Sequence, residues 1–569
     1  MVSITRSLDK LSSKRFVRLA VYGVAVVFFF GLILLPPILG ILSQGGTIGA
    51  VVNNPSLLDR ANSAILNSFT LAIVVSIIDV FLGVPMAWLI VRGHRQRLLG
   101  ILDTMVNIPF ILPTSALGYS LLVFWNGPGG LDFLFGTPII SPGWLLVGML
   151  HFAFSYPVVV RVMVGEIMEY DITYEVAART LGSPPFTVAR TVSLPILKSG
   201  MIASFLLAFS RSLSETGATL IVAGAFSIPT GTVPPFENGP VFIQLNKSLP
   251  GQLGVGALVY VSAMLIIFSL LIFTAVRLLA PRIRFPIKKV WPNPERKLSR
   301  EPTRKLRDSA SIIIFILIIV LPSLYVAIPS FSAVESGTLA QAIQAQGIWS
   351  NYWSSIVNSF SIAAVVTILV ILSGLPVAVL IGRKKVGSLG SSILDSLVNI
   401  PIIVPSVALG VTLPFFWKAV GVSPGGDFGL VVLAHLCITY PYFVRSAIAA
   451  IENINPELEN AARTLGGHPF TSFRRVTLPL MKYSVMAGSI IVFTRSLAET
   501  GATVALATNL KTAPVLIVDW VKSLLNSHFL GTNPIASPTD IGLGCGILIL
   551  FSILILVALG RFVRVRRKT

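Results

Sequence analysis

The chain has 569 residues, of which 54% are hydrophobic and only 12% are charged, and its mean hydropathy is +0.85. Soluble domains carry about 25% charged residues, so this composition excludes an ordinary soluble protein and predicts a polytopic membrane protein. The formal net charge of +20 raises the question of nucleic-acid binding, which the placement of the basic residues decides.

Twelve apolar stretches are long enough to cross a bilayer core, which takes about 20 residues. We expect helices, because lipid offers no hydrogen-bond partner to an open backbone and the alternating pattern of a membrane barrel is absent. In chain order they lie near residues 17–43, 64–91, 101–125, 142–165, 196–224, 252–280, 309–331, 355–382, 393–418, 428–451, 482–508 and 541–563.

The basic residues gather between these stretches, in the clusters Arg6–Arg18, Arg92–Arg97, Arg277–Arg307, Arg383–Lys385 and Arg561–Lys568. All five clusters fall on one side of the membrane if both termini are cytoplasmic, which is the positive-inside pattern. We therefore expect a multi-pass protein of the cell membrane with both termini cytoplasmic. We expect the protein to be surrounded by membrane lipid, and we expect no nucleic-acid partner.

The second half of the chain repeats the first. "RSLSETGAT" at 211–219 returns as "RSLAETGAT" at 495–503, an offset of 284. The blocks "NIPFILPTSALG" and "NIPIIVPSVALG", which start at Asn107 and Asn399, are offset by 292, so the first copy has eight extra residues after them (292 − 284). Each copy holds six spans, an even number, so both enter the membrane in one orientation. The predicted fold is an all-α membrane protein with two parallel six-helix repeats, related by an axis along the membrane normal.

The predicted domains are a first unit at 1–285, a linker at 286–308 and a second unit at 309–569. The linker is rich in proline and basic residues and has no apolar periodicity. We expect it to be cytoplasmic and to join two units of one kind.

A polar segment is repeated between the fourth and fifth span of each half. It reads "YEVAARTLGSPPFTVARTVSLPIL" at 174–197 and "LENAARTLGGHPFTSFRRVTLPLM" at 458–481. Helix-forming residues lead to Gly182 or Gly466, which suits the left-handed position that closes a helix, and the prolines that follow discourage continuation. The pattern predicts a short helix across the membrane face, where small side chains allow close approach of another surface. An ordinary connecting helix is the alternative.

This segment resembles the cytoplasmic loop of the membrane subunits of type I ABC importers, which carries Glu-Ala-Ala, three residues and Gly, and ends in Leu-Pro. The resemblance implies coupling helices at 173–183 and 457–467, each docking in a groove of an ATP-hydrolysing subunit. The implied contact residues are Glu175, Ala177, Ala178, Arg179, Gly182, Glu459, Ala461, Ala462, Arg463 and Gly466.

The chain departs from the family pattern at the acidic residue. In the family the acid directly precedes Ala-Ala, whereas Val176 and Asn460 hold that place here and the glutamates come one residue earlier. One residue rotates a helical side chain by about 100°, so the direction of the acid is left open.

No G-x-x-x-x-G-K-[ST] phosphate loop occurs in the sequence, so we expect no enzyme activity and no cofactor or metal in this chain. The resemblance implies two copies of an ATP-binding subunit, which hold ATP and Mg²⁺, and an extracytoplasmic substrate-binding protein. The alternative is a proton- or ion-coupled transporter of the major facilitator type. That class carries the signature G-x-x-x-D-R between its second and third spans. The corresponding loops of this chain read "RGHRQRLLG" and "GRKKVGSLG", and both lack the aspartate.

Charged residues recur inside the fifth span of each half, where an isolated charge costs at least ~2.5 to 3.5 kcal/mol. Their i, i+4 spacing places arginine and glutamate on one helix face, where they neutralise each other. Two compatible interpretations remain: pairs that hold the bundle together, and a translocation path with glycines that allow close approach. The predicted path residues are Arg211, Glu215, Gly217, Arg495, Glu499 and Gly501.

The third span of each half carries two prolines, which remove helix hydrogen bonds. Both a packing kink and a cavity lining remain open for Pro109, Pro113, Pro401 and Pro405. The lone histidines of the fourth spans are expected to satisfy local hydrogen bonds rather than to bind metal.

The cargo is indicated by two resemblances that differ. "RSLSETGATLIVAG" and "RSLAETGATVALATN" are similar to the fifth span of molybdate, tungstate and sulfate permeases. The fusion of two units instead resembles ferric iron, thiamine and aminophosphonate systems. We expect a small inorganic ion, with an oxyanion ahead of ferric iron.

Overall fold

The computed structural model describes residues 9–93, 96–127, 130–131, 136–137, 139–224, 234–279, 282 and 291–564. In these residues the fold is all-α, as predicted. Nine described helices are long and apolar enough to cross a membrane, and the number reaches twelve if each of three bent helix pairs is one span. The twelve predicted spans correspond to the larger number. Arg6, Lys568 and residues 286–290 of the predicted linker lie outside the described residues.

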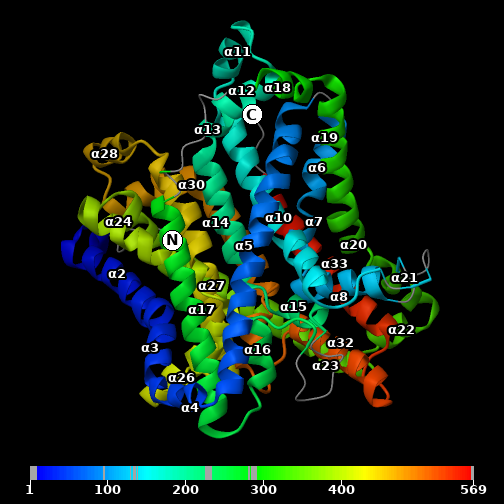
Figure 1. Cartoon of the computed structure of the whole chain (residues 1–569). Coiled ribbons are helices and arrows are strands. Elements are labelled where there is room, and N and C mark those ends of the chain that lie inside the picture. Colours follow the sequence, from blue (N-terminus) through cyan, green and yellow to red (C-terminus); the bar gives the residue numbers. More distant parts are fainter. Residues whose placement is uncertain are drawn as a thin grey trace.

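The described residues of the first half form fifteen α-helices, which are labelled in Figure 1. They are α2 (Arg15–Phe28), α3 (Leu35–Ser43), α4 (Ile48–Val52), α5 (Pro55–Arg92), α6 (Gln96–Met105), α7 (Ile108–Ile111), α8 (Thr114–Asn126), α10 (Trp144–Glu169), α11 (Thr173–Thr180), α12 (Pro185–Val188), α13 (Leu194–Ile196), α14 (Lys198–Ser214), α15 (Gly217–Val222), α16 (Gly239–Asn246) and α17 (Gly251–Leu279).

The second half follows the same order after α18 (Pro292–Leu298). Its helices are α19 (Glu301–Ile314), α20 (Leu321–Leu324), α21 (Ala327–Glu335), α22 (Thr338–Ile343), α23 (Ile348–Gly382), α24 (Gly387–Val398), α25 (Ile400–Ile403), α26 (Ser406–Val420), α27 (Gly426–Glu452), α28 (Pro456–Thr464), α29 (Pro469–Ser472), α30 (Leu478–Leu497), α31 (Gly501–Leu506), α32 (Ala513–Leu530) and α33 (Pro538–Arg564).

The third span of each half is fully broken at the second of its two prolines. The helices on either side of the break meet at 106° in the first half and at 104° in the second. Leu112 and Val404, just before Pro113 and Pro405, have extended backbone, which is the conformation that a following proline favours. The loss of helix hydrogen bonds predicted at these prolines is confirmed.

The fifth span lies earlier in the chain than the predicted 196–224 and 482–508. Its helical segment begins at Pro185 and bends by 70° on the way to Ser214, whereas the second copy runs from Pro469 to Leu497 as one span. A π-helical turn precedes each Leu-Pro pair, at Ala189–Ser193 and Phe473–Thr477. The helix continues through the pair in the second half and bends just after it, at Leu197, in the first. Such a turn accommodates a residue that lacks the N–H donor.

The first span of each half packs against the other half. Helices α2 and α3 (dark blue in Figure 1) contact α23 and α26, and α19 and α20 (green) contact α5 and α8. The ring of Phe29 stacks on Tyr440 at 5.4 Å between centroids, and Phe315 stacks on Tyr156 at 6.0 Å. Aromatic pairs of this geometry stabilise packing beyond the buried area. The two halves are therefore interlocked.

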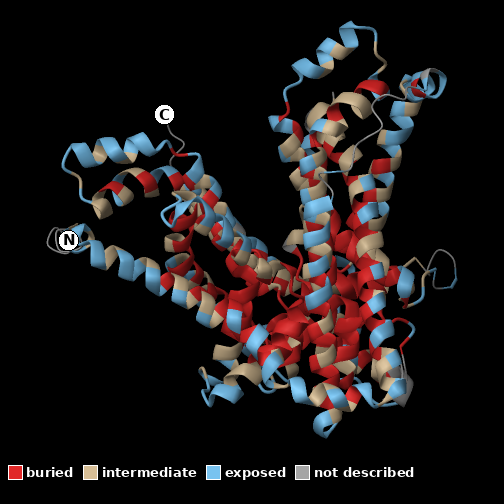
Figure 2. Cartoon of the chain, turned by 60° about the vertical axis from the view of Figure 1, so that its left-hand side comes forward, coloured by how far each residue is buried: buried red, intermediate tan, exposed pale blue. Residues whose placement is uncertain are grey.

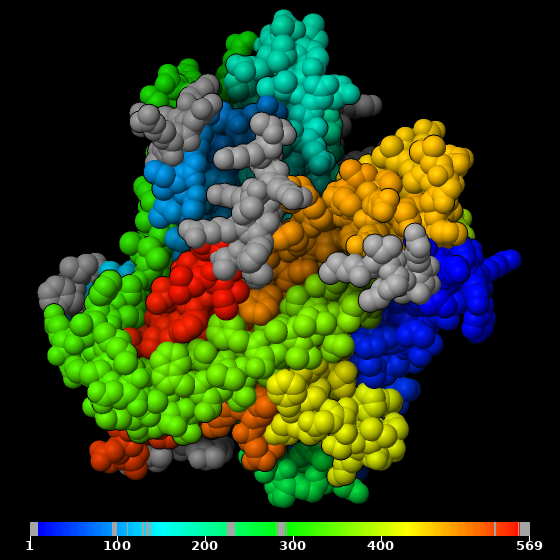
Figure 3. Space-filling view, turned by 180° about the vertical axis from the view of Figure 1, so that it is seen from behind, coloured from blue at the N-terminus to red at the C-terminus, as the bar shows by residue number. Residues whose placement is uncertain are grey.

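Buried residues gather where the two arms of the molecule meet, away from α11 and α28 (Figure 2). On the back of the molecule α33 (red) lies along the α21–α23 segment (light green), as Figure 3 shows. There a Cβ added to Gly542 would approach Cβ of Pro329 to 2.4 Å, and the hydroxyl of Ser330 donates to the Gly542 carbonyl at 2.7 Å. Small residues thus allow close helix contact in the apolar interior.

The end of the linker is helical and docked, which its proline content did not predict. Residues 292–298 form α18, and residues 301–308 belong to α19. The carboxylate of Glu295 accepts a hydrogen bond from the Thr187 hydroxyl and pairs with Arg190 at 2.8 Å. Pro294 and Pro302 fall within the first turns of these helices, where a missing N–H costs nothing.

The N-terminal residues make the same docking contact on the other half. The Thr471 hydroxyl donates to Oδ1 of Asp9 at 2.6 Å, and the Phe470 N–H donates to the Ser12 hydroxyl at 3.2 Å. In the first half the N–H of Phe186 donates to the Ser299 hydroxyl at 3.0 Å. Each half is therefore clamped, at the start of its fifth span, by the residues that precede the first span of the opposite half.

We expect Glu295→Gln to loosen the first clamp and Asp9→Asn the second. The Thr187 hydroxyl, above all, holds the pKa of Glu295 below its ordinary 4.5. A depressed pKa stabilises the folded contact above pH 4.5, and this contribution is lost as the pH falls through the lowered pKa. Hydrogen exchange at 186–190 should therefore rise in Glu295→Gln and below pH 4.5 in the wild type. Unchanged exchange at 186–190 under both conditions would contradict the clamp, and exchange at 470–474 in Glu295→Gln at neutral pH serves as the internal control.

Candidate functional site

Two short helices, α11 and α28, stand at the same end of the molecule (Figure 1), here named the coupling-helix end. Both close with the same pattern: the N–H of Gly182 donates to the Arg179 carbonyl and that of Ser183 to the Ala178 carbonyl, with equivalent bonds at Gly466 and Gly467. Gly182 has φ +86° and Gly466 φ +85°. The predicted left-handed closure is confirmed, and it is the position where glycine has no Cβ penalty.

The displaced glutamates point back into their own half. Oε1 of Glu175 accepts from the Ser193 hydroxyl at 3.1 Å, and Oε1 of Glu459 accepts from the Thr477 hydroxyl at 3.0 Å. Glu459 also pairs with Arg383 at 2.8 Å. The acid one residue early therefore anchors the helix to the fifth span, which answers the direction left open by the sequence.

The outer face of each coupling helix is exposed and apolar at its end. Leu181 is 87% exposed and its equivalent Leu465 is 88% exposed. Ala177, Arg179, Ala461 and Arg463 are exposed as well, whereas Ala178 and Ala462 are half-buried. An exposed apolar patch with polar surroundings is typical of a protein-binding surface. The predicted contact residues divide accordingly into an outer set and the inward glutamates.

The breaks in the two fifth spans contact each other. A Cβ added to Gly217 would meet Cβ of Thr500 at 2.5 Å, and one added to Gly501 would meet the Thr216 hydroxyl at 2.6 Å. The close approach predicted at both glycines is present in the structure. Their role in translocation stays a prediction.

Each broken third span donates a hydrogen bond to the fifth-span break of the other half. The Thr114 hydroxyl donates to the Ala498 carbonyl at 3.4 Å, and the Ser406 hydroxyl donates to the Ser214 carbonyl at 2.9 Å. Both donors begin the helix after the proline break. The breaks therefore bring backbone carbonyls of one half within reach of hydroxyls of the other, deep in the protein, where irregular backbone is tolerated.

The two histidines bridge the fifth-span breaks. Nδ1 of His151 lies 2.8 Å from the Ser212 hydroxyl and Nε2 lies 2.9 Å from the Thr219 hydroxyl. His435 repeats both contacts, at 2.9 Å each. Both ring nitrogens are thus occupied by local hydrogen bonds, as predicted.

The two arginines of the fifth spans have different partners. Nη1 of Arg495 lies 2.7 Å from Oε2 of Glu499. Arg211 makes no ion pair in the described part of the chain; its Nε donates to the Phe154 carbonyl at 3.0 Å, and its guanidinium lies 3.8 Å from the centroid of the Phe154 ring. The predicted neutralising pair is therefore confirmed in the second half and wrong in the first.

Both glutamates lie past the end of their helix, and Oε1 of Glu499 accepts the N–H of Ala502 at 3.2 Å. Helix α14 ends at Ser214, and Glu215 has extended backbone with ψ 129°. Its Oε1 accepts the N–H of Ala218 at 3.0 Å, across the break. The break is thus common to both halves, and what differs is the partner of the arginine, which in the first half is the Phe154 carbonyl and ring.

Both arginines line one small cavity between the halves. Its other lining residues are Ser210, Ser214, Pro401, Ile402, Val404, Ser406, Ile438 and Tyr442. Its volume is ≈ 10 Å³, about the room that one water molecule needs. The structure is thus closed at this level, and Pro401 is a cavity-lining residue.

One repeated network was missed by the sequence analysis. Arg161 donates to Oδ1 of Asn107 at 2.8 Å and pairs with Asp103 at 2.6 Å. Arg445 repeats the bond to Asn399 at 2.8 Å. The signal was available, because all three residue types recur at the offsets of the duplication. The network ties the fourth span to the start of the third-span break.

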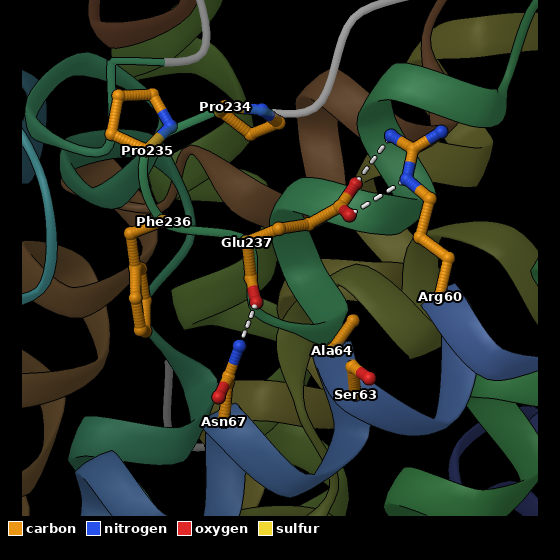
Figure 4. Close-up of a pocket in the computed structure, with 8 residues that line it drawn as sticks. All are labelled: Arg60, Ser63, Ala64, Asn67, Pro234, Pro235, Phe236 and Glu237. Carbon is orange, nitrogen blue, oxygen red and sulfur yellow. Dashed lines mark hydrogen bonds and ion pairs between the residues drawn. The ribbon is translucent and has the colours of Figure 1, made fainter.

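A larger pocket of ≈ 370 Å³ (Figure 4) lies between the start of α5 and the chain before α16, away from α11 and α28 in Figure 1. Arg60 and Glu237 form a two-bond ion pair on its rim, at 2.7 and 2.6 Å, and Asn67 donates to the Glu237 carbonyl at 2.8 Å. Phe236 and Pro235 form its apolar side. The pair holds the N-terminal turns of α5 to the chain before α16.

Comparison with known proteins agrees with this architecture. The family model described as "Binding-protein-dependent transport system inner membrane component" matches residues 63–285 and 374–566. The sulfate transport system permease protein CysT of Salmonella typhimurium is 30% identical over 253 residues, which are 43% of this chain and 88% of the relative. The molybdenum transport system permease protein ModB of Escherichia coli is 30% identical over 226 residues, 38% of this chain and 93% of the relative.

A third relative is the molybdenum transport system permease protein ModB of Mycobacterium tuberculosis, 34% identical over 178 residues, 28% of this chain and 67% of the relative. Each of these relatives covers less than half of the chain, whereas the family model matches twice. The chain therefore belongs to the binding-protein-dependent transport system inner membrane components, the type I ABC permeases, with two units of that family fused in one chain.

Proposed function

We propose that this chain is the complete transmembrane pathway of an ATP-driven importer for a tetrahedral oxyanion of the sulfate and molybdate class. The observation that carries the proposal is the pair of coupling helices, which present equivalent exposed leucines, 87% and 88% exposed, at one end of an interlocked bundle. A single chain with two such surfaces needs no second permease subunit.

Two copies of one ATP-binding subunit are the partners that fit these surfaces. The closures at Gly182 and Gly466 have the same hydrogen bonds, and both helices are followed by the sequence Leu-Gly. One kind of groove therefore suits both. ATP and Mg²⁺ belong to those subunits. The basic residues Arg92, Arg383 and Lys385 lie near the coupling-helix end, so the positive-inside rule makes this end, and both termini, cytoplasmic.

The cargo assignment rests on the named relatives and on the central cavity. CysT and ModB are named for sulfate and molybdenum transport. The cavity holds Arg211 and Arg495 from opposite halves with hydroxyls of Ser210, Ser406 and Tyr442 beside them. Arginine and hydroxyl donors suit an oxyanion, whereas a bare ferric ion would meet two cations there. A binding protein would deliver the anion at the end that carries the 370 Å³ pocket.

The proposal predicts oxyanion uptake that requires every partner. We expect ATP-dependent sulfate or molybdate uptake in proteoliposomes that hold the chain, its ATP-binding subunit and its binding protein, and no ATP hydrolysis by the chain alone. Calorimetry on the binding protein with sulfate, molybdate, tungstate, ferric ion and thiamine tests the cargo. Tight binding of ferric ion or thiamine without any oxyanion response would overturn the cargo and leave the permease class standing.

A further inference from the structure

The central cavity is electrically asymmetric although the halves are copies. The charge of Arg495 is balanced by Glu499 at 2.7 Å. The guanidinium of Arg211 instead lies over two aromatic rings, 3.8 Å from the Phe154 centroid and 4.9 Å from the Phe110 centroid. An ion pair cancels charge, whereas a ring face stabilises a cation and leaves its net charge in place. Among the described residues, the cavity therefore holds one arginine in an ion pair and one that makes none.

The asymmetry is written in the sequence. Phe154 corresponds to Ile438 at the offset of 284, and Phe110 corresponds to Ile402 at the offset of 292. The second half thus has no aromatic platform at these two positions, and its arginine turns to the carboxylate. In the first half the rings and the Phe154 carbonyl hold Arg211 away from Glu215.

Two hydroxyls beside Arg211 are committed to bonds between the halves. Ser210 of the first half donates to the Ile402 carbonyl of the second, and Ser406 of the second half donates to the Ser214 carbonyl of the first at 2.9 Å. Separation of the halves breaks both bonds at once. It frees two donors at the rim of the cavity in which Arg211 already lies.

We propose that Arg211 is the side chain that contacts the transported oxyanion, with the hydroxyls of Ser210 and Ser406 as added donors once the halves part. This assignment rests on the proposed function. The planar guanidinium matches an oxyanion with two parallel N–H donors. At ≈ 10 Å³ the closed cavity holds about one water, so the anion contact belongs to the open conformation only. Arg495 lines the same cavity but is paired with Glu499.

The test compares Arg211→Gln with the neutral double variant Arg495→Gln, Glu499→Gln in the reconstituted assembly with binding protein and sulfate or molybdate. We expect Arg211→Gln to lower uptake by at least about tenfold, as for the loss of a charge-assisted hydrogen bond, while binding-protein-stimulated ATP hydrolysis continues. The double variant should lose clearly less uptake than Arg211→Gln, because it removes a pair without net charge. Arg211→Lys should recover part of the uptake, since it keeps the charge without the fork.

Melting temperature separates contact from folding. If Arg211→Gln melts early, Arg211→Met, which keeps an unbranched side chain over Phe154, replaces it. Uptake retained by the glutamine or methionine variant, or an equal loss in the double variant, overturns the assignment and leaves the proposed function intact. Absence of oxyanion uptake by the wild-type assembly overturns the proposed function and this assignment together.

Discussion

Gly182→Val and Gly466→Val should each abolish coupled transport while the membrane bundle stays folded. Both glycines close a coupling helix with φ near +85°, a region that β-branched residues almost never adopt. A Cβ at either position meets no atom of the chain within 4 Å, so the effect comes from backbone strain and from the surface offered to the partner. We expect uptake to fall at least about tenfold for a strain of ~1 to 2 kcal/mol, with ATP hydrolysis no longer stimulated by the binding protein.

The chain offers a matched control at the other end of the bundle. Gly421 closes α26 with φ +73° and the same two hydrogen bonds, from Gly421 and Val422 to Lys418 and Trp417. A Cβ there also meets nothing within 4 Å. Gly421→Val imposes the same strain away from the coupling helices and should leave uptake nearly unchanged.

Asparagine at the coupling glycines separates the effect of backbone strain from the effect of a changed docking surface. It tolerates the left-handed conformation but adds a side chain to the docking surface, so Gly182→Asn should lie between wild type and valine. Full uptake in both valine variants contradicts the coupling role. Loss in only one of them shows that the two ATP-binding subunits do not contribute equally.

Removal of one member of the Arg495–Glu499 pair should destabilise the protein more than removal of both. Their side chains are 11% and 3% exposed, and a buried charge left without its partner costs about 3 to 5 kcal/mol. Glu499→Gln or Arg495→Gln should therefore melt well below the wild type. The double variant should melt above at least one single variant, because no charge is left alone.

The same cycle at Arg211 and Glu215 is the internal control. These residues make no ion pair with each other in the described structure, so their coupling free energy should be smaller than that of Arg495 and Glu499. Thermal melting of the six variants in one detergent measures both cycles. Strong coupling at Arg211–Glu215, or plain additivity at Arg495–Glu499, would contradict the asymmetry of the cavity.

The clearest failure of sequence reasoning lies in that asymmetry. The spacing of arginine and glutamate is the same in "RSLSETGAT" and "RSLAETGAT", so the sequence predicted the same pair twice. The structure shows that the helix stops at Ser214 and that Phe154, 57 residues away, takes the Nε–H of Arg211. The spacing of arginine and glutamate describes only neighbouring residues, whereas the partner that Arg211 takes lies on another span.

The family match also decided between two classes that the sequence left open. Twelve spans in two parallel repeats suit both an ABC permease and a major facilitator, and the matched model names the first. The two coupling segments already favoured the ABC permease. Their motif and its left-handed closure depend only on neighbouring residues, so both can be recognised from the sequence. The two ATP-binding subunits and their number remain proposals.

The sequence by itself determined what depends on neighbouring residues. Apolar length located the spans, prolines located the breaks at Pro113 and Pro405, and glycines located the left-handed closures at Gly182 and Gly466. Each follows from covalent geometry within one or two helical turns. The duplication then gave the orientation of the two halves relative to each other.

Only the tertiary structure decided which distant residues meet. The exchange of first spans, seen in Phe29 on Tyr440 and Phe315 on Tyr156, leaves no mark on hydropathy, because either neighbour offers an equally apolar surface. The inward turn of Glu459 depends on Arg383 at the end of another helix. In an apolar interior, packing shape and the need of each buried polar group for a partner select these contacts, and both become defined only when the helices are assembled.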